Sequence, residues 1–298
     1  MTGAPEHIPV MTAEALRFLA PERGGVFLDC TVGLGGHSRA MLEAGATRVI
    51  GIDRDTDALD RARQTLAPWA DRVDLVHSDY RAIDAVLDGL DVALVDGALA
   101  DLGVSSMQFD APGRGFSFQR DELLDMRMDR TSGATAAQLI ASADERELAD
   151  TIYAYGEERF SRRIARAIVT ARREAPIDTT LRLAAIVRRA VPSRGYQRID
   201  PATRTFQALR IWVNRELDGL DAFLAAMATR LRAGARLVVI TFHSLEDRIV
   251  KHTLRAFEKS ADAAVKVLTK KPVVPGDDEI GRNPRARSAK LRAAEKLA

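Results

Sequence analysis

The sequence is poor in the features that would place a protein in a membrane or an oxidising compartment. It contains a single cysteine, Cys30, so no disulfide can form within the chain. No apolar stretch approaches the ~20 residues needed to span a bilayer. The N-terminus lacks a basic segment followed by an apolar run, which a secretory signal would require. We therefore expect a cytoplasmic protein with no membrane partner.

Net charge is also small, at +2, but it is unevenly distributed. Residues 1–105 carry 9 basic and 17 acidic side chains, residues 106–205 carry 17 and 14, and residues 248–298 carry 13 and 6. An acidic surface repels a polyanion, so any nucleic acid should meet the middle and the C-terminal part of the chain. Charge alone is also compatible with a solvated, arginine-rich surface.

Short apolar runs separated by helical patterns predict an α/β fold. The runs lie at 26–30, 48–53, 73–77, 92–95, 236–241 and 265–268. Strands separated by helices of this length are typical of a parallel sheet covered on both faces. The pattern also predicts a long helix over 205–231 and a helix over 245–257, and we expect the segment from Pro272 onward to be weakly ordered.

Residues 106–205 break this alternation, because they contain several helical patterns and no good strand run. In 159–173 one helical face is apolar, with Phe160, Ile164, Ala167, Ile168 and Ala171. The adjoining stripe consists of Arg159, Arg162, Arg163, Arg166 and Arg173. We therefore expect a discontinuous α/β domain, formed by residues 1–105 and 206–298 and interrupted by a helical insert over 106–205.

A glycine-rich loop, Thr31-Val32-Gly33-Leu34-Gly35-Gly36-His37, joins the first predicted strand to a helix. Such a loop places free backbone N–H groups around a ligand, and glycine permits close approach. Asp53 lies 20 residues beyond Gly33, at the end of the next strand, where an acidic residue commonly accepts hydrogen bonds from ribose hydroxyls. These features predict a nucleoside-containing cofactor, but they do not separate a dinucleotide from S-adenosylmethionine.

Two details of the loop disfavour a dinucleotide and a nucleoside triphosphate. Ser38 occupies the position of the third glycine in the dinucleotide fingerprint, and no Walker-type lysine follows the loop.

Asp79 and Tyr80 end the third strand, where a carboxylate and a ring are suited to contact an adenine. The alternatives are core packing for Tyr80 and a helix cap for Asp53.

Longer motifs begin at the fourth strand. They are Val95 to Ser106, Arg114 to Phe118, Leu124 to Asp129, Tyr155 to Ser161, Pro201 to Arg210, Phe242 to Arg248 and Asn283 to Ser288. In these motifs the chain resembles the bacterial small-subunit rRNA cytidine-N4-methyltransferases, and the likeness covers nearly the whole chain. The sequence departs from that pattern at Met107 and Asp200, where relatives usually have proline and histidine, and at Glu122-Leu123, where they have Gly-Pro.

The resemblance implies a class I, Rossmann-like methyltransferase sheet interrupted by a helical insert that recognises rRNA. It implies S-adenosylmethionine as the cofactor and a cytidine in the decoding centre of 16S rRNA as the target. The cofactor contacts carried over from the family are Gly35, Gly36, His37, Asp53, Tyr80, Asp101 and Gln108. Whether the substrate is free rRNA or the small ribosomal subunit stays open, as does the oligomeric state.

The reaction would be an in-line attack of the exocyclic nitrogen of cytosine on the sulfonium methyl group. That nitrogen is a poor nucleophile, and an acceptor aimed at its hydrogens would favour the reactive form. The chain has no Asp/Asn-Pro-Pro-aromatic turn after the fourth strand, and Asp101 to Ser106 occupy that place. Asp101 is therefore the candidate catalytic residue, with a turn-capping carboxylate as the alternative. We expect Ser105 and Ser106 to shape the turn.

We predict no metal site, because the histidines show no zinc-ligand spacing and have no cysteine partners. The histidines are His7, His37, His77, His243 and His252. His243 is either a contact to the target or a hydrogen-bonded structural residue. Two rival functions remain: an NAD-dependent oxidoreductase on the same fold, and a non-enzymatic RNA-binding protein that keeps the cofactor as a structural ligand.

Overall fold

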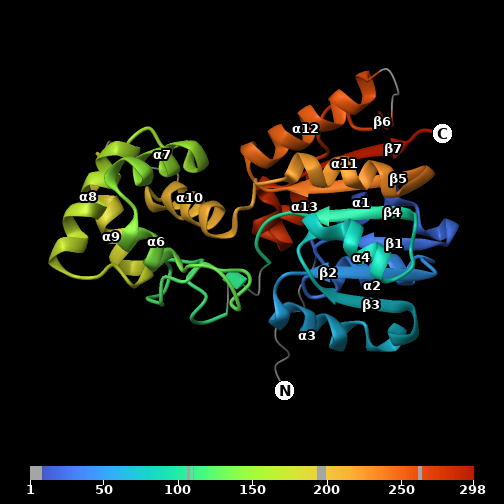
Figure 1. Cartoon of the computed structure of the whole chain (residues 1–298), viewed down its shortest axis with the longest axis horizontal. Helices are drawn as coiled ribbons and strands as arrows, with labels where there is room; N and C mark the ends of the chain where they lie inside the picture. Colours follow the sequence, from blue (N-terminus) through green and yellow to red (C-terminus); the bar gives the residue numbers. More distant parts are fainter. Residues whose placement is uncertain (1–8, 106–107, 110, 193–198, 261–263) are drawn as a thin grey trace. The chain divides into compact units, whose positions relative to one another are not determined.

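The computed structural model describes residues 9–105, 108–109, 111–192, 199–260 and 264–298. The chain forms two compact units (Figure 1). The first comprises Met1–Gly103 and Gly219–Ala298, and the second comprises Val104–Asp218. In the part of the chain that the structure describes, no helix is both long enough and apolar enough to cross a membrane.

The first unit is built on a seven-stranded sheet with the order β3-β2-β1-β4-β5-β7-β6. Its strands are β1 (Val26–Asp29), β2 (Arg48–Asp53), β3 (Val73–His77), β4 (Val95–Asp101), β5 (Leu231–Thr241), β6 (Val265–Val267) and β7 (Lys290–Lys296). The first five are parallel, and β7 runs antiparallel between β5 and β6. The strand order reverses between β1 and β4, which is where doubly wound sheets bind ligands. The predicted class I, Rossmann-like fold is confirmed.

Helices cover both faces of this sheet because successive strand residues point to opposite sides. Phe27 and Leu99 pack with helices α1 (Thr12–Leu19), α2 (Gly36–Glu43) and α3 (Thr56–Thr65). Leu28 and Ala98, their neighbours along the strands, pack with α4 (Ile83–Gly89), α11 (Leu220–Arg230) and α12 (Ser244–Lys259). The two cores fix the positions of the strand ends that carry the candidate site.

The second unit is helical, with its own core. Its helices are α6 (Ala136–Ser142), α7 (Glu145–Gly156), α8 (Ser161–Glu174), α9 (Thr180–Ala190) and α10 (Ala202–Asn214). In α8 the predicted apolar face is confirmed, since Ile164 and Ile168 are fully buried in this core. The predicted arginine stripe lies on the exposed side of the helix.

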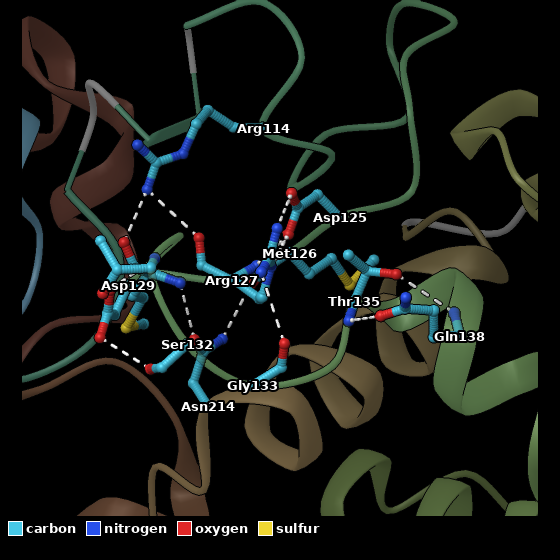
Figure 2. A network of polar contacts seen from close by, with 12 residues as sticks. Arg114, Asp125, Met126, Arg127, Asp129, Ser132, Gly133, Thr135, Gln138 and Asn214 are labelled. Carbon is cyan, nitrogen blue, oxygen red and sulfur yellow. Dashed lines mark hydrogen bonds and ion pairs between the residues drawn. The ribbon is translucent and has the colours of Figure 1, made fainter.

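A polar network holds the loop before α6 against the end of α10 (Figure 2). The buried Asn214 side chain accepts a hydrogen bond from the Met128 N–H at 2.7 Å and donates one to the Met126 carbonyl at 2.8 Å. The Arg114 guanidinium donates to the carbonyls of Arg127 and Met128. Met126 has a positive φ of 63°, which is unfavourable for a side chain of this size. The network thus stabilises a loop conformation that the backbone preference of Met126 disfavours.

The structure differs from the sequence prediction in three elements. The region 205–231 is two helices, because Arg215 and Gly219 adopt left-handed conformations between α10 and α11. The second unit therefore ends at Asp218, whereas we expected the insert to end at 205. The fourth strand starts at Val95, where the predicted run ended.

The third difference is at the C-terminus, where the prediction of weak order from Pro272 onward is wrong. This segment forms α13 (Asp277–Arg282), a 3-10 turn and the interior strand β7. Leu291 and Ala293 of β7 are fully buried.

Candidate active site

Acidic residues end three adjacent parallel strands of the first unit. Asp29 closes β1, Asp53 closes β2 and Asp101 closes β4. Asp29 is paired in register with Gly51 on one side and Leu99 on the other, so the other two carboxylates lie two residues further along. Glu246 of α12 joins them and is almost fully buried, at 1% exposed. The carboxyl edge of the sheet at its switch point is therefore strongly acidic.

The glycine-rich loop follows Asp29 and leads into α2. Gly33 and Gly35 have φ values of 52° and 83°, which glycine adopts without strain. A Cβ on Gly35 would lie 3.1 Å from Leu66, and one on Gly36 would lie 2.9 Å from Pro9. Packing of the chain against itself therefore requires both glycines. The first N–H groups of α2 have no partners within the helix and are available to a ligand.

Asp53 ties this loop to the sheet. Its carboxylate accepts hydrogen bonds from the Gly33 N–H at 2.8 Å and the Asp55 N–H at 2.9 Å. Burial raises the pKa of Asp53 to about 6 in spite of these bonds. Asp55 accepts from the Asp57 N–H and caps α3, so Asp53 itself is not the helix cap.

Among the described carboxylates of the site, Asp101 is the one with a buried, unsatisfied oxygen. Its Oδ1 atom is buried and has no hydrogen-bond partner among the residues that the structure describes. Burial, together with the negative charges of Asp29 and Glu246, raises the pKa of Asp101 well above its ordinary value. Its backbone N–H donates to the Thr31 hydroxyl at 2.7 Å, so the backbone at Asp101 is held while one side-chain oxygen has no donor.

His37 lies beside Asp101, with 3.8 Å between its Nδ1 and Asp101 Oδ2. Its Nε2 lies 2.9 Å from the Val10 carbonyl, which can only accept, so Nε2 carries the hydrogen. Burial lowers the pKa of His37 to about 4, and the ring is neutral at neutral pH. Nδ1 therefore presents a lone pair toward Asp101. The His37 side chain thus has internal partners, which leaves its main chain for a cofactor.

Asp29 and Ser38 form a second buried pair. The Ser38 hydroxyl donates to Asp29 Oδ2 at 2.7 Å, and the Thr31 N–H donates to Oδ1 at 3.3 Å. Burial raises the pKa of Asp29 to about 6 despite these bonds.

Sequence reasoning did not single out Asp29 or Glu246. An acidic residue at the end of an apolar strand run was the available signal for Asp29.

The residues after β3 are engaged within the protein. The Tyr80 ring packs edge-on against Phe223 at 4.7 Å and contacts the core, as its alternative interpretation proposed. Asp79 forms hydrogen bonds with the Arg81 guanidinium and an ion pair with Arg54 at 3.1 Å. Burial acts to raise the pKa of Asp79, but these arginines outweigh it and the pKa lies below its usual value. The Asp79 carboxylate is therefore largely occupied.

His243 caps α12 and belongs to its framework. Its Nδ1 accepts from the Glu246 N–H at 3.4 Å, and Glu246 Oε2 accepts from the N–H groups of Phe242 and His243. These contacts favour the structural interpretation of His243. Glu246 is the member of this motif that adds negative charge near Asp101.

Gln108 belongs to the second unit, and its described contacts are local. Its Oε1 accepts from the Ser105 N–H at 3.0 Å, while the Ser105 hydroxyl accepts from the Gln108 N–H at 3.3 Å. Ser105 therefore shapes this turn, as expected, and Ser106 lies outside the described residues. The assignment of Gln108 as a cofactor contact stays a prediction.

The structure shows the surroundings of two of the departures from the family pattern. Asp200 forms an ion pair with Arg188 at 2.8 Å and accepts a hydrogen bond from the Ala202 N–H at the start of α10. Leu123 is 66% exposed and pairs with Thr179 in an isolated bridge. Met107 lies outside the described residues.

A family model for the MraW methylases matches residues 4–297. The chain belongs to the MraW methylase family. Three similar proteins carry the name ribosomal RNA small subunit methyltransferase H. The protein from Nitrobacter winogradskyi is 52% identical over 309 residues, covering 99% of this chain and 92% of its own. Those from Nitratidesulfovibrio vulgaris and Sorangium cellulosum are 51% and 53% identical, over 99% and 98% of this chain and 97% and 91% of their own.

Proposed function

We propose that this MraW-family methylase transfers a methyl group from S-adenosylmethionine to N4 of a cytidine in the decoding centre of 16S rRNA. The family match along nearly the whole chain and the names of its relatives support a small-subunit rRNA substrate. They also favour this function over an NAD-dependent oxidoreductase. The proposed site of action is the cytoplasm, on free 16S rRNA or the small ribosomal subunit.

The observation that carries the proposal is the buried, unpaired oxygen of Asp101 in an acidic site. S-adenosylmethionine carries a positively charged sulfonium group and an ammonium group, and both suit a site lined by Asp29, Asp101 and Glu246. The two negative charges of a dinucleotide pyrophosphate would be repelled by these carboxylates. The residues present therefore fit this cofactor.

The proposed contacts combine main-chain atoms of the glycine-rich loop with side chains at the strand ends. The main chain at Gly35, Gly36 and His37 would hold the cofactor at the start of α2. Asp53 would accept from the ribose hydroxyls through lone pairs not used by Gly33 and Asp55. Tyr80 would contribute its ring, and Asp101 and Gln108 would complete the contacts.

The chemical step breaks the bond between sulfur and the methyl carbon and forms a bond from that carbon to N4. The amino nitrogen must also lose a proton. Near a bound cation the Asp101 carboxyl is favoured in its ionised form. Asp101 Oδ1 then accepts a hydrogen bond from the amino group of the cytosine. This contact favours the nucleophilic geometry of the amino nitrogen. The Asp101 carboxylate also takes up the proton that the nitrogen releases. His37 Nδ1, 3.8 Å from Asp101 Oδ2, offers a further lone pair beside this carboxylate.

We further propose that the helical unit binds the rRNA. Residues 104–218 carry 19 arginines, 16 acidic residues and no lysine. Arginine guanidinium groups match phosphate geometry and stack on bases. In α8, Arg162 and Arg163 are exposed, whereas Arg166 lies 3.3 Å from Glu145.

Single-turnover transfer of a labelled methyl group tests the function. The acceptors are 16S rRNA and small subunits from a strain lacking this protein, and mass spectrometry locates the product. We expect one N4-methylated cytidine in the decoding centre, absent from that strain before the reaction. Cofactor binding with no transfer to either acceptor would support the non-enzymatic alternative instead.

A further inference from the structure

The second unit contains a pocket of about 410 Å³ that belongs to none of the assignments above. It lies where three connections of the helical unit meet: the α7–α8 turn, the end of α9 and the start of α10. The described residues that line it are Glu158, Arg159, Phe160, Val191, Pro192, Ile199, Asp200, Pro201 and Arg204. Its volume is within the range of pockets that hold small ligands.

One side of the pocket is apolar. Phe160 is half-buried against the core of the unit, and Ile199 is 58% exposed, which is unusual for an isoleucine. Val191, Pro192 and Pro201 extend this wall. Flat aromatic and apolar side chains are the surfaces on which unpaired RNA bases stack.

The other side carries two exposed arginines and one buried carboxylate. Arg159 stacks over the Phe160 ring at 4.6 Å, and Arg204 Nη1 lies 3.8 Å from Glu158 Oε2. Glu158 is only 5% exposed, and its Oε1 accepts from the Phe160 N–H at 2.8 Å. Asp200, the second acid of the lining, is already paired with Arg188. The 3.8 Å between Arg204 and Glu158 Oε2 is longer than a hydrogen bond, whereas Arg188 lies 2.8 Å from Asp200. Glu158 Oε2 is therefore the carboxylate oxygen better placed to accept from a ligand.

We propose that this pocket binds one unpaired nucleotide of the RNA substrate, with a base that carries an exocyclic amino group. The base stacks on the Phe160 wall, its amino group donates to Glu158, and the adjoining phosphates pair with Arg159 and Arg204. A carboxylate accepts from the amino group of cytosine, adenine or guanine, whereas the O4 atom of uracil repels it. The inference rests on the proposed function, because it requires an RNA substrate.

The test measures binding of fluorescent five-nucleotide RNAs to the full chain by anisotropy. We expect wild-type protein to bind oligo(C) and oligo(A) at least about fivefold more tightly than oligo(U). Glu158→Gln should remove this preference, because an amide both donates and accepts. Arg159→Ala should weaken the binding of all three RNAs by about threefold or more. The matched control is Arg146→Ala, which removes an arginine 91% exposed on α7 and outside the pocket; it should leave every affinity within twofold.

Three results would each overturn the pocket assignment. Wild type binds the three RNAs equally, or Glu158→Gln keeps the base preference of wild type. The third is that Arg159→Ala and Arg146→Ala lose the same amount of RNA affinity. If Glu158→Gln fails to fold, Ile199→Asp tests the same wall, because it places a negative charge at an exposed position. Methyl transfer to 16S rRNA is measured in the same preparations. Transfer without base preference rejects only the pocket, whereas base preference without transfer rejects only the proposed reaction.

Discussion

Replacing Asp101 with asparagine should stabilise the ligand-free protein at pH 8 and slow methyl transfer. In the folded protein Asp101 Oδ1 is buried without a donor. Burial raises the pKa of Asp101, and the negative charges of Asp29 and Glu246 raise it further. An unsatisfied buried group costs about 1–3 kcal/mol, and more when charged. Since the side chain is 22% exposed, solvent screens part of this cost. We expect the asparagine variant to gain about 1–2 kcal/mol at pH 8.

The gain should depend on pH with a defined sign. The unfolded pKa of an aspartate is about 3.9, and that of folded Asp101 is well above it. The folded state therefore binds the Asp101 proton more tightly than the unfolded state does. The contribution of the protonated carboxyl to stability is fully present below pH 4 and is lost as pH rises through the folded pKa. Asparagine does not titrate, so the difference between variant and wild type should be small at pH 4 and largest at pH 8.

Thermal and urea unfolding at pH 4, 6 and 8 measure this difference. A gain of 1–2 kcal/mol corresponds to about 2–8 °C in Tm for a unit of this size. Asp60→Asn, at an exposed side chain on α3, is the matched control and should change stability little at any pH. The reasoning fails if Asp101→Asn is destabilised at pH 8, or if its gain is the same at all three pH values.

Cofactor and rate measurements extend the same test. S-adenosylmethionine should raise the Tm of wild type more than that of Asp101→Asn, because its positive charge compensates the carboxylate. At saturating cofactor and RNA, Asp101→Ala should lower the single-turnover rate, and Asp101→Asn should retain more activity than alanine. A saturated rate equal to wild type in both variants would make Asp101 a cofactor ligand without a catalytic role.

Three further variants test the site and the helical unit. Asp53→Ala should weaken cofactor binding, measured by calorimetry, by about 2–4 kcal/mol, since the ribose and the Gly33 N–H both lose an acceptor. Reversing Arg162 and Arg163 to glutamate should weaken rRNA binding and reduce the slope of log K against log salt by about 2. Asn214→Ala should destabilise the helical unit by about 2–4 kcal/mol in urea unfolding, because it leaves buried backbone groups unpaired.

Each of these predictions has its own control. Asp53→Asn keeps one acceptor oxygen and should lie between wild type and alanine, whereas unchanged affinity in a folded alanine variant would reject the ribose contact. Arg146→Glu should leave the salt slope unchanged. If Arg162 and Arg163 instead pair inside the protein, their reversal would lower Tm while the slope stayed constant. An Asn214→Ala variant as stable as wild type would show that the network in Figure 2 does not hold its loop.

The sequence alone was sufficient to predict the parallel strands of the sheet and the glycine-rich loop that follows β1. Apolar runs of β-branched residues bounded by glycine and charged residues have few other interpretations, and β1, β2 and β3 lie close to where these runs predicted them. The amphipathic pattern of 159–173 likewise predicted α8 and its buried face, because helical periodicity is a local property. The family motifs identified the methylase family from sequence alone.

Other features were decided by distant contacts. Lys290–Lys296 has helix-forming residues, yet it becomes a strand because β5 and β6 leave a position between them whose backbone groups it satisfies. The break between α10 and α11 depends on two left-handed residues that an apolar pattern does not reveal. The same holds for the acidic site. The positions of Asp29, Asp101 and Glu246 in the chain do not reveal that these residues lie close together. Burial at the shared sheet edge then raises the pKa values of Asp29 and Asp101.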